Sequence, residues 1–377
     1  MTGFSFERAW AVLAKEFTQM RRDRITFAMM LGFPVVQLLL FGYAINSDPK
    51  HLPTAVLVQD DGAFSRSILE SLKTTGYFDI IGVARSSAEL DRMMATGKAQ
   101  FTVTIPADFT RRVVRQDKPQ ILVEADAADP TATGGAVTAL SQLPNLALAH
   151  DLTGALSGRQ AGAAPFEVVV HRRYNPEGLS AYNIVPGLLG VVLSMTLVMM
   201  TALGVTREVE RGTMESLLAT PVQPLEVMVG KLAPYVLVGL VQAAVILTLA
   251  RGLFDVPMRG GWAALGVGVL LFILGSLALG FLVSTVASNQ RQAMQLSVFY
   301  IMPSILLSGF MFPFSGMPAW AQAIGTAIPV THFLRIVRGA LLKGHGFTEM
   351  WPSMGALGIF VVAVSTLAIL RYRTTLD

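Results

Sequence analysis

Six long stretches without a charged side chain constrain this 377-residue chain more than any other feature. A helix that crosses a lipid bilayer needs about 20 consecutive apolar residues. Any single stretch would also fit a buried core helix, but six of them in one chain favour insertion into a membrane. The sequence therefore predicts an α-helical integral membrane protein with six transmembrane helices, at residues 25–45, 181–205, 232–250, 260–287, 293–314 and 351–370.

The composition excludes several other classes of protein. Only 14% of the residues are charged and 53% are hydrophobic, whereas a soluble domain carries about 25% charged residues. Cysteine is absent, which excludes disulfides, thiol catalysis, iron–sulfur clusters and cysteine zinc sites. The apolar run at 25–45 is too long for a secretory signal peptide and no small-x-small cleavage site follows it, so it is predicted to be a permanent anchor.

Residues 46–180 have a different composition from the rest. They hold 13 of the 29 Lys and Arg residues and 15 of the 25 Asp and Glu residues, as expected of a water-soluble domain inserted between the first two spans. Strand patterns alternate with helical patterns along this segment, which predicts a small mixed sheet with helices packed on it. The expected strands are 54–59, 79–84, 101–105, 120–124 and 166–170, and the expected helices 64–75, 86–94, 108–116 and 131–156.

No catalytic or metal site is predicted in the inserted domain. His150 and His171 are isolated in the sequence, and turn chemistry accounts for the aspartates of the domain. HExxH, GxSxG and Cys/His clusters are absent from the sequence.

The distribution of Lys and Arg predicts the orientation. The short segments on the side of the two termini carry 11 Lys and Arg residues, and the opposite short segments carry five, namely Arg251, Arg259, Arg335, Arg338 and Lys343. Cytoplasmic segments are enriched in these residues. Both termini are therefore predicted to lie in the cytoplasm and the α/β domain outside it.

Two further segments are predicted to lie at the membrane surface. Residues 1–24 form an amphipathic pattern whose apolar stripe includes Phe6, Trp10 and Phe17, as expected of a helix in the cytoplasmic interface. Residues 312–345 are apolar but interrupted by proline, and none of their runs can span, which favours an outer re-entrant region.

The cytoplasmic loop between the second and third spans, 206–231, carries the most distinctive motif. Thr213 can cap a short helix with Glu215 in its first turn, and Pro221 ends that helix. Such a helix, with an apolar face and charged flanks, suits docking into a groove of a partner protein. The residues predicted to dock are Glu208, Glu210, Arg211, Gly212, Thr213, Met214, Glu215, Leu217, Leu218 and Pro221.

This motif resembles the E-x-E-R-G-T-x-E-x-L-x-x-T-P hallmark of type-2 ABC transporter permeases. The resemblance extends to the order of the segments, since one subgroup of these permeases has a large extracytoplasmic domain after its first span and is linked to drug and small-molecule export. It implies export of a small amphipathic, drug-like or lipid-like substrate from the cytoplasm or inner leaflet of a bacterial inner membrane. It also implies separate ATPase subunits and a second permease, as an identical or a different copy.

The sequence agrees with a permease whose ATP is hydrolysed by separate subunits. The chain has no GxxxxGK[ST] motif, so Mg-ATP is expected to bind the partner ATPase and no cofactor is expected in this chain. A periplasmic adaptor stays open as a further partner of the outer domain, and no nucleic-acid partner is expected. The alternatives are an ion-coupled secondary transporter and a non-transporting receptor or scaffold. The six spans contain no Asp, Glu or His, which disfavours proton coupling, and no cytoplasmic loop is long enough for a signalling domain.

The predicted orientation can be tested with fused reporters. A reporter that is active only outside the cytoplasm should be active when fused after Ala161 and inactive when fused after Asp377, because the two positions are predicted to lie on opposite sides. Activity in both fusions, or the reverse pattern, would contradict the orientation.

Overall fold

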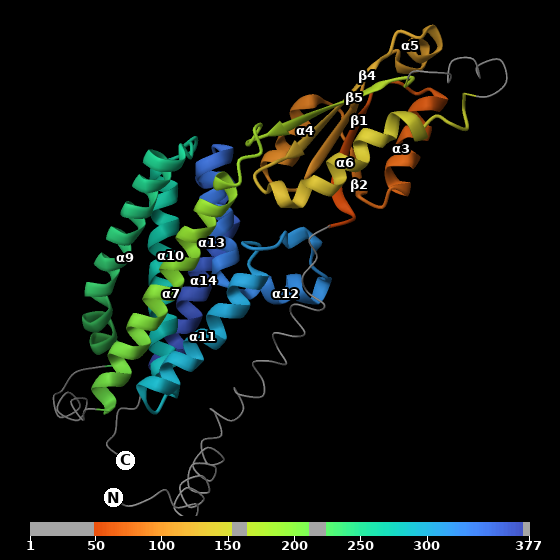
Figure 1. The fold of residues 1–377 in the computed structure, drawn as a ribbon. Helices are drawn as coiled ribbons and strands as arrows, with labels where there is room; N and C mark the ends of the chain where they lie inside the picture. The colour runs from red at the N-terminus through yellow and green to blue at the C-terminus, as the bar shows by residue number, and fades with distance from the viewer. Residues whose placement is uncertain (1–48, 153–163, 211–223, 372–377) are drawn as a thin grey trace, which may run out of the picture.

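The computed structural model of the protein describes residues 49–152, 164–210 and 224–371. The predicted span 25–45 and the interfacial residues Phe6, Trp10 and Phe17 lie outside this part of the chain. The described residues form an α/β domain and a group of long helices. The α/β domain stands at the end of the helices where α7 (Ala181–Glu210) begins (Figure 1).

The α/β domain is built on a five-stranded mixed sheet with the strand order β2-β1-β3-β4-β5. Strand β1 is parallel to β2 and β3, β3 is antiparallel to β4, and β4 is parallel to β5. The predicted mixed sheet is therefore confirmed. Its strands are β1 (Leu52–Val58), β2 (Phe78–Val83), β3 (Phe101–Ile105), β4 (Gln120–Asp126) and β5 (Glu167–Arg173), and its helices α3 (Ala63–Thr74), α4 (Ser87–Ala95), α5 (Phe109–Arg115) and α6 (Pro130–Leu146).

The domain has its own hydrophobic core. Side chains of α3, α5 and α6 pack on one face of the sheet, where Phe101 and Phe109 are fully buried. Helix α4 covers part of the other face through Leu90. These two clusters contain no residue of the long helices, so the domain buries its apolar surface without them.

Asp60 joins two helices of this domain at the end of β1. Its carboxylate accepts hydrogen bonds from Ser65 Oγ at 2.7 Å, from Thr110 Oγ1 at 2.6 Å and from the Gly62 amide at 3.1 Å. Gly62 has to be small here, because a Cβ atom would lie 1.8 Å from Thr110 Oγ1. Partial burial works against the charged form, but these hydrogen bonds outweigh it and lower the pKa of Asp60.

Four described helices are long and apolar enough to cross a membrane, by length and composition. The qualifying segments are Ala181–Glu210 (α7), Leu232–Phe254 of α9 (Pro224–Phe254), Trp262–Val286 (α10) and Phe347–Arg371 (α14). They correspond to four of the six predicted spans. The remaining helix of the group, α11 (Gln290–Leu307), lies beside α7.

The predicted number of six spans is thus not confirmed. The stretch 293–314 was predicted to span, but α11 ends at Leu307 after 18 residues. Gly309 then has a positive φ of 82°, a conformation that ends a helix. Only residues 290–307 are helical, and they begin with the polar sequence Gln-Arg-Gln.

Close contacts between helices occur where side chains are small. A Cβ atom on Gly280 would lie 2.6 Å from the Val198 carbonyl oxygen of α7, and one on Gly268 would lie 2.6 Å from Ile336. The rings of Phe272 and Phe333 stack with their centroids 4.1 Å apart. Helix α10 is therefore the buried centre of the group.

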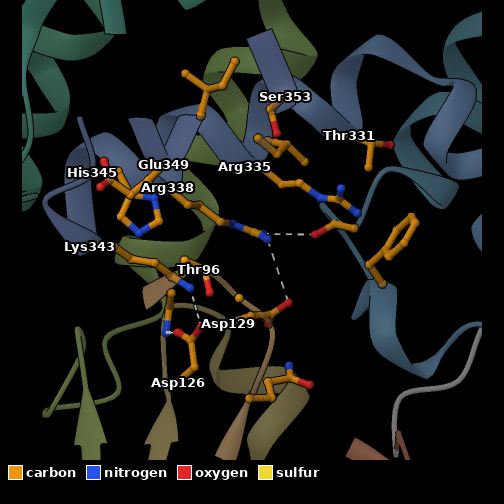
Figure 2. A pocket seen from close by; sticks show the side chains of 18 of the residues that line it. Thr96, Asp126, Asp129, Thr331, Arg335, Arg338, Lys343, His345, Glu349 and Ser353 are labelled. Atoms are coloured by element: carbon orange, nitrogen blue, oxygen red, sulfur yellow. Dashed lines mark hydrogen bonds and ion pairs between the residues drawn. The ribbon is translucent and has the colours of Figure 1, made fainter. Parts of the chain in front are cut away.

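Between α11 and α14 the chain forms only short helices. They are η3 (Phe314–Gly316), α12 (Ala319–Ala327), α13 (Pro329–Arg338) and the π-helical turn η4 (Gly339–Lys343). Helix α13 packs against α7, α10 and α14. Its apolar face is buried, while its basic residues are left at the edge of the helical group that faces the α/β domain (Figure 2).

We expect the separate core to let residues 50–175 fold when expressed without the spans, and Asp60 to stabilise the product. Asp60→Asn removes a charged acceptor of several hydrogen bonds and should lower the free energy of unfolding by about 1–3 kcal/mol at pH 7. The pKa of Asp60 is lowered in the folded state, so its contribution should be complete above its unfolded pKa of about 3.9 and should fade as the pH drops through the folded value.

Urea unfolding at pH 7 and pH 3 would measure this difference. Asp61→Asn is the matched control, since Asp61 is exposed and adjacent and should leave stability unchanged. Equal stability of the Asp60→Asn domain and the unaltered domain at pH 7, or a non-cooperative transition of the latter, would contradict the prediction.

Candidate functional site

A cavity of about 560 Å³ lies where the α/β domain meets the helices. The domain contributes residues of the turn after α4 and of the end of β4. The helical part contributes the loop after α11, α13, η4 and the first turns of α14. Figure 2 shows that basic side chains from α13 and η4 face acidic side chains of the domain. The principal charged residues of the wall are Asp126, Asp129, Arg335, Arg338, Lys343, His345 and Glu349.

Arg338 connects three parts of the chain. Its guanidinium donates hydrogen bonds to the side-chain oxygen of Asn183 on α7 and, at 3.1 Å, to the Gly309 carbonyl oxygen. It also lies 4.0 Å from the Asp129 carboxylate of the α/β domain. Burial lowers the pKa of Arg338, and the nearby Asp129 and Asp126 carboxylates oppose that shift. The charged guanidinium is held by this set of acceptors.

Lys343 makes the second link to the domain. Its ammonium group forms an ion pair with the Asp126 carboxylate, and both side chains are nearly buried, at 13% and 11% exposure. The same ammonium lies 5.2 Å from the centre of the Tyr174 ring, a cation–π contact. The other carboxylate oxygen of Asp126 accepts a hydrogen bond from the Ala128 backbone amide at 3.2 Å, which is a turn interaction of the predicted kind. The ion pair with Lys343 is a second contact of Asp126, which turn chemistry does not explain.

Arg335 differs from its neighbours. It lies one helical turn before Arg338, and its guanidinium stacks over the Phe314 ring at 5.1 Å. No carboxylate of the described residues lies within ion-pair distance of it. Arg335 therefore brings a charge to the cavity that the described protein groups do not neutralise.

His345 closes the side of the cavity near η4. A Cβ atom on Gly339 would lie 2.7 Å from His345 Nδ1, so the absence of a side chain there makes room for the imidazole. His345 Nε2 is buried without a hydrogen-bond partner among the described residues. Burial and the nearby Lys343 charge lower the pKa of His345, which favours the neutral imidazole.

The described part of the chain contains no group of three or more His, Asp or Glu side chains arranged to hold a metal ion. The acidic residues of the cavity wall bind basic side chains and backbone amides instead. The arrangement suits binding and docking, and we assign no bond-breaking chemistry to it.

Two of the predicted docking residues lie at the other end of α7. Only Glu208 and Glu210 fall within the described residues, and Arg211 to Pro221 lie outside them. The Glu210 carboxylate accepts two hydrogen bonds from Gln290, one from its backbone N–H at 2.8 Å and one from its side-chain Nε2 at 2.5 Å. Gln290 begins α11, so Glu210 links the end of α7 to the start of α11. The structure thus gives Glu210 a local role that the sequence did not suggest.

Sequence reasoning missed the cavity. Arg335, Arg338 and Lys343 were counted only as charges that set the orientation, and Asp126 and Asp129 only as turn residues. One signal was available, since Arg335 and Arg338 share a face of a short amphipathic helix. The acidic partners of Arg338 and Lys343 come from a segment more than 200 residues earlier, and no local pattern connects the two segments.

Comparison with known proteins identifies the family. The sequence model of the family described as "ABC-2 family transporter protein" matches residues 24–370. The chain belongs to the ABC-2 transporter family. It is an ABC-2 permease, a class of subunit that lacks a nucleotide-binding domain and works with ATPase subunits. The predicted family and the assignment of ATP hydrolysis to a partner are confirmed.

Relatives of this ABC-2 permease cover most of its length. It is 30% identical over 346 residues to the "Probable multidrug ABC transporter permease YbhS" of Escherichia coli, with 90% of each chain covered. It is 26% identical over 368 residues to YbhR of the same organism, which has the same description, with 98% and 99% covered. It is 28% identical to the "Inner membrane transport permease YhhJ", with 86% of each covered. The permease is thus a multi-pass protein of the inner membrane.

The contribution of the Lys343–Asp126 pair to domain docking can be measured by a double-mutant cycle. Lys343→Met leaves the Asp126 carboxylate buried without its cation, which should lower amide-exchange protection in residues 125–129 and 339–346 by about tenfold or more. Asp126→Asn keeps the turn acceptor but leaves Lys343 unpaired. The double variant should lose less protection than the two single losses combined.

The exposed pair of Lys73 and Glu70, 3.6 Å apart, provides the control, because Lys73→Met should change protection little. Additive losses in the double variant would show that the two side chains do not act as a pair.

Proposed function

We propose that this permease exports a small amphipathic, drug-like or lipid-like molecule from the cytoplasm or the inner leaflet, using ATP hydrolysed by separate subunits. The observation that carries the proposal is the full-length match to the ABC-2 family, with two relatives described as probable multidrug transporter permeases. A third relative, 20% identical, is described as "Linearmycin resistance permease protein LnrN" of Bacillus subtilis. These descriptions support export of a small molecule by this chain too.

The proposal places the α/β domain outside the cytoplasm, over the outer ends of the helices. The 11-to-5 distribution of Lys and Arg supports this orientation. Residues 312–345 would then form the outer re-entrant region, because their short helices lie next to the α/β domain. The end of α7 with Glu210 would face the cytoplasm, some 45 Å away by the length of a 30-residue helix.

Proposed partners are two ATPase subunits and a second permease. The relatives YbhR and YbhS are two distinct permeases of one organism, which supports a heterodimer over a homodimer. Helices α9 and α14 bury only 17% and 22% of their apolar windows within this chain. Their exposed faces are suited to lipid or to a second permease.

Docking of the ATPase is proposed for the segment from Glu208 to Pro221. Its short helix would present Met214, Leu217 and Leu218 to a groove in the ATPase, with Arg211 and Glu215 at the rim. The link between Glu210 and Gln290 supports a mechanical role, because movement of the docked segment would reach both α7 and α11 through that contact.

An ion-coupled secondary transporter is the alternative. The six predicted spans contain no Asp, Glu or His, whereas proton-coupled carriers use ionisable groups inside the membrane. Transport itself separates the alternatives. Reconstituted with its co-purified ATPase, the permease should move an amphipathic fluorescent dye across the vesicle membrane only when Mg-ATP is present. Dye movement driven by a proton or sodium gradient without ATP would contradict the proposal.

The docking segment can be tested separately from the local role of Glu210. Met214→Asp places a charge in an apolar contact and should reduce ATPase co-purification by about tenfold or more. Charge reversal at Glu210 and Arg211 should also weaken it. Gln290→Leu is the matched control, since it removes the side-chain hydrogen bond to Glu210 and keeps the backbone one, without altering the docking segment.

Normal co-purification of Met214→Asp would show that the ATPase docks elsewhere. If only Gln290→Leu and the Glu210 reversal impaired co-purification, the effect would belong to the contact between α7 and α11.

A further inference from the structure

The charges in the cavity between the α/β domain and the helices are not equally engaged. Each carboxylate on its wall already has a donor within the protein. Asp126 binds Lys343, and Asp129 lies beside Arg338 and accepts Asn183 Nδ2 at 3.4 Å. Glu349 accepts the Gly346 amide at 2.9 Å. A cationic ligand would have to displace these donors to reach an acidic group.

The basic side chains of the cavity, in contrast, can still bind an acceptor. Among the described residues, Arg335 has neither a hydrogen-bond acceptor nor an ion-pair partner and lies against the Phe314 ring, and Arg338 Nε is buried without an acceptor. The two guanidiniums lie one turn apart on α13 and both point into the cavity (Figure 2). Ser315 and Ser353 also line it. Planar guanidiniums bind carboxylate and phosphate oxygens in pairs of hydrogen bonds.

Apolar side chains form another part of the wall. Phe314, Leu334 and Met350 line the same space, and its volume of about 560 Å³ lies within the range of sites for drug-sized molecules. Since α14 continues from this wall as an apolar helix, the cavity lies at the level where a membrane-spanning segment begins. A ligand with both a charged and an apolar part matches this surface.

We propose that this cavity binds an amphiphile with an anionic headgroup, the phosphate or carboxylate contacting Arg335 and Arg338 and the apolar body contacting Phe314 and Leu334. The site selects against cationic amphiphiles of the same length, because Asp126 and Asp129 already lie beside basic side chains. As a statement about the exported substrate, this inference rests on the proposed function. Binding itself needs neither ATP nor the ATPase, so it is tested independently of transport.

The experiment uses the full chain in an uncharged glycoside detergent, without ATPase. The bound probe is 11-(dansylamino)undecanoic acid, whose fluorescence rises in an apolar site. Dodecyl phosphate should displace it, whereas dodecyltrimethylammonium, with the same tail and the opposite charge, should not. Inorganic phosphate at the same concentration should not displace it either, because it lacks the apolar body. Displacement by phosphate alone would overturn the amphiphile assignment in favour of a free anion.

Variants locate the binding site. Arg335→Gln removes the unpaired charge and should raise the half-displacing concentration of dodecyl phosphate by about tenfold or more. Arg335→Lys keeps the charge and should stay within about threefold of the unaltered protein. Arg251→Gln is the control, since Arg251 is exposed at the end of α9, away from the cavity wall. Displacement by the cation as strong as by dodecyl phosphate, or equal binding in the Arg335→Gln and Arg251→Gln proteins, would overturn the proposal.

Discussion

The position of the α/β domain depends on Arg338, which lies where three parts of the chain meet. Its guanidinium is shared by Asn183 on α7, the carbonyl of Gly309 after α11, and Asp129 of the α/β domain. A nearly buried arginine without these acceptors would be unfavourable by several kcal/mol. The orientation of the domain on the helices is therefore tied to the loop after α11 and to the start of α7. The ion pair between Lys343 and Asp126 adds a second fixed point.

The contact between the α/β domain and the helices depends on where the chain places its charged and its apolar residues. Long helices can cross a membrane only if their backbone groups are satisfied internally and their charges lie near their ends. Here the short helices between α11 and α14 carry basic side chains at the edge of the helical group, and the domain supplies the acidic partners. The basic and acidic side chains at this junction are not all paired with one another. The cavity between them therefore contains basic groups that can still bind an acceptor.

The two ends of α7 have different roles in this arrangement. One end carries Asn183 in the junction with the α/β domain, and the other carries Glu210 in contact with Gln290. A continuous 30-residue helix therefore links the cavity to the segment proposed to dock an ATPase. A rigid helix with a defined contact at each end can transmit a displacement, although Pro186 lies within it.

The sequence determined the elements that depend on local pattern. Strand and helix periodicities predicted every strand of the α/β domain, because alternation and helical spacing are properties of neighbouring residues. The apolar runs predicted the four spanning helices, and the permease motif predicted the family. The stretch 293–314 is not confirmed as a span, because a turn at Gly309 ends α11 although the apolar composition continues. Only the tertiary structure decided the strand order, the pairing of Lys343 with Asp126 and the unpaired state of Arg335. These features join residues up to 217 positions apart, and contacts over such separations depend on how the folded parts pack.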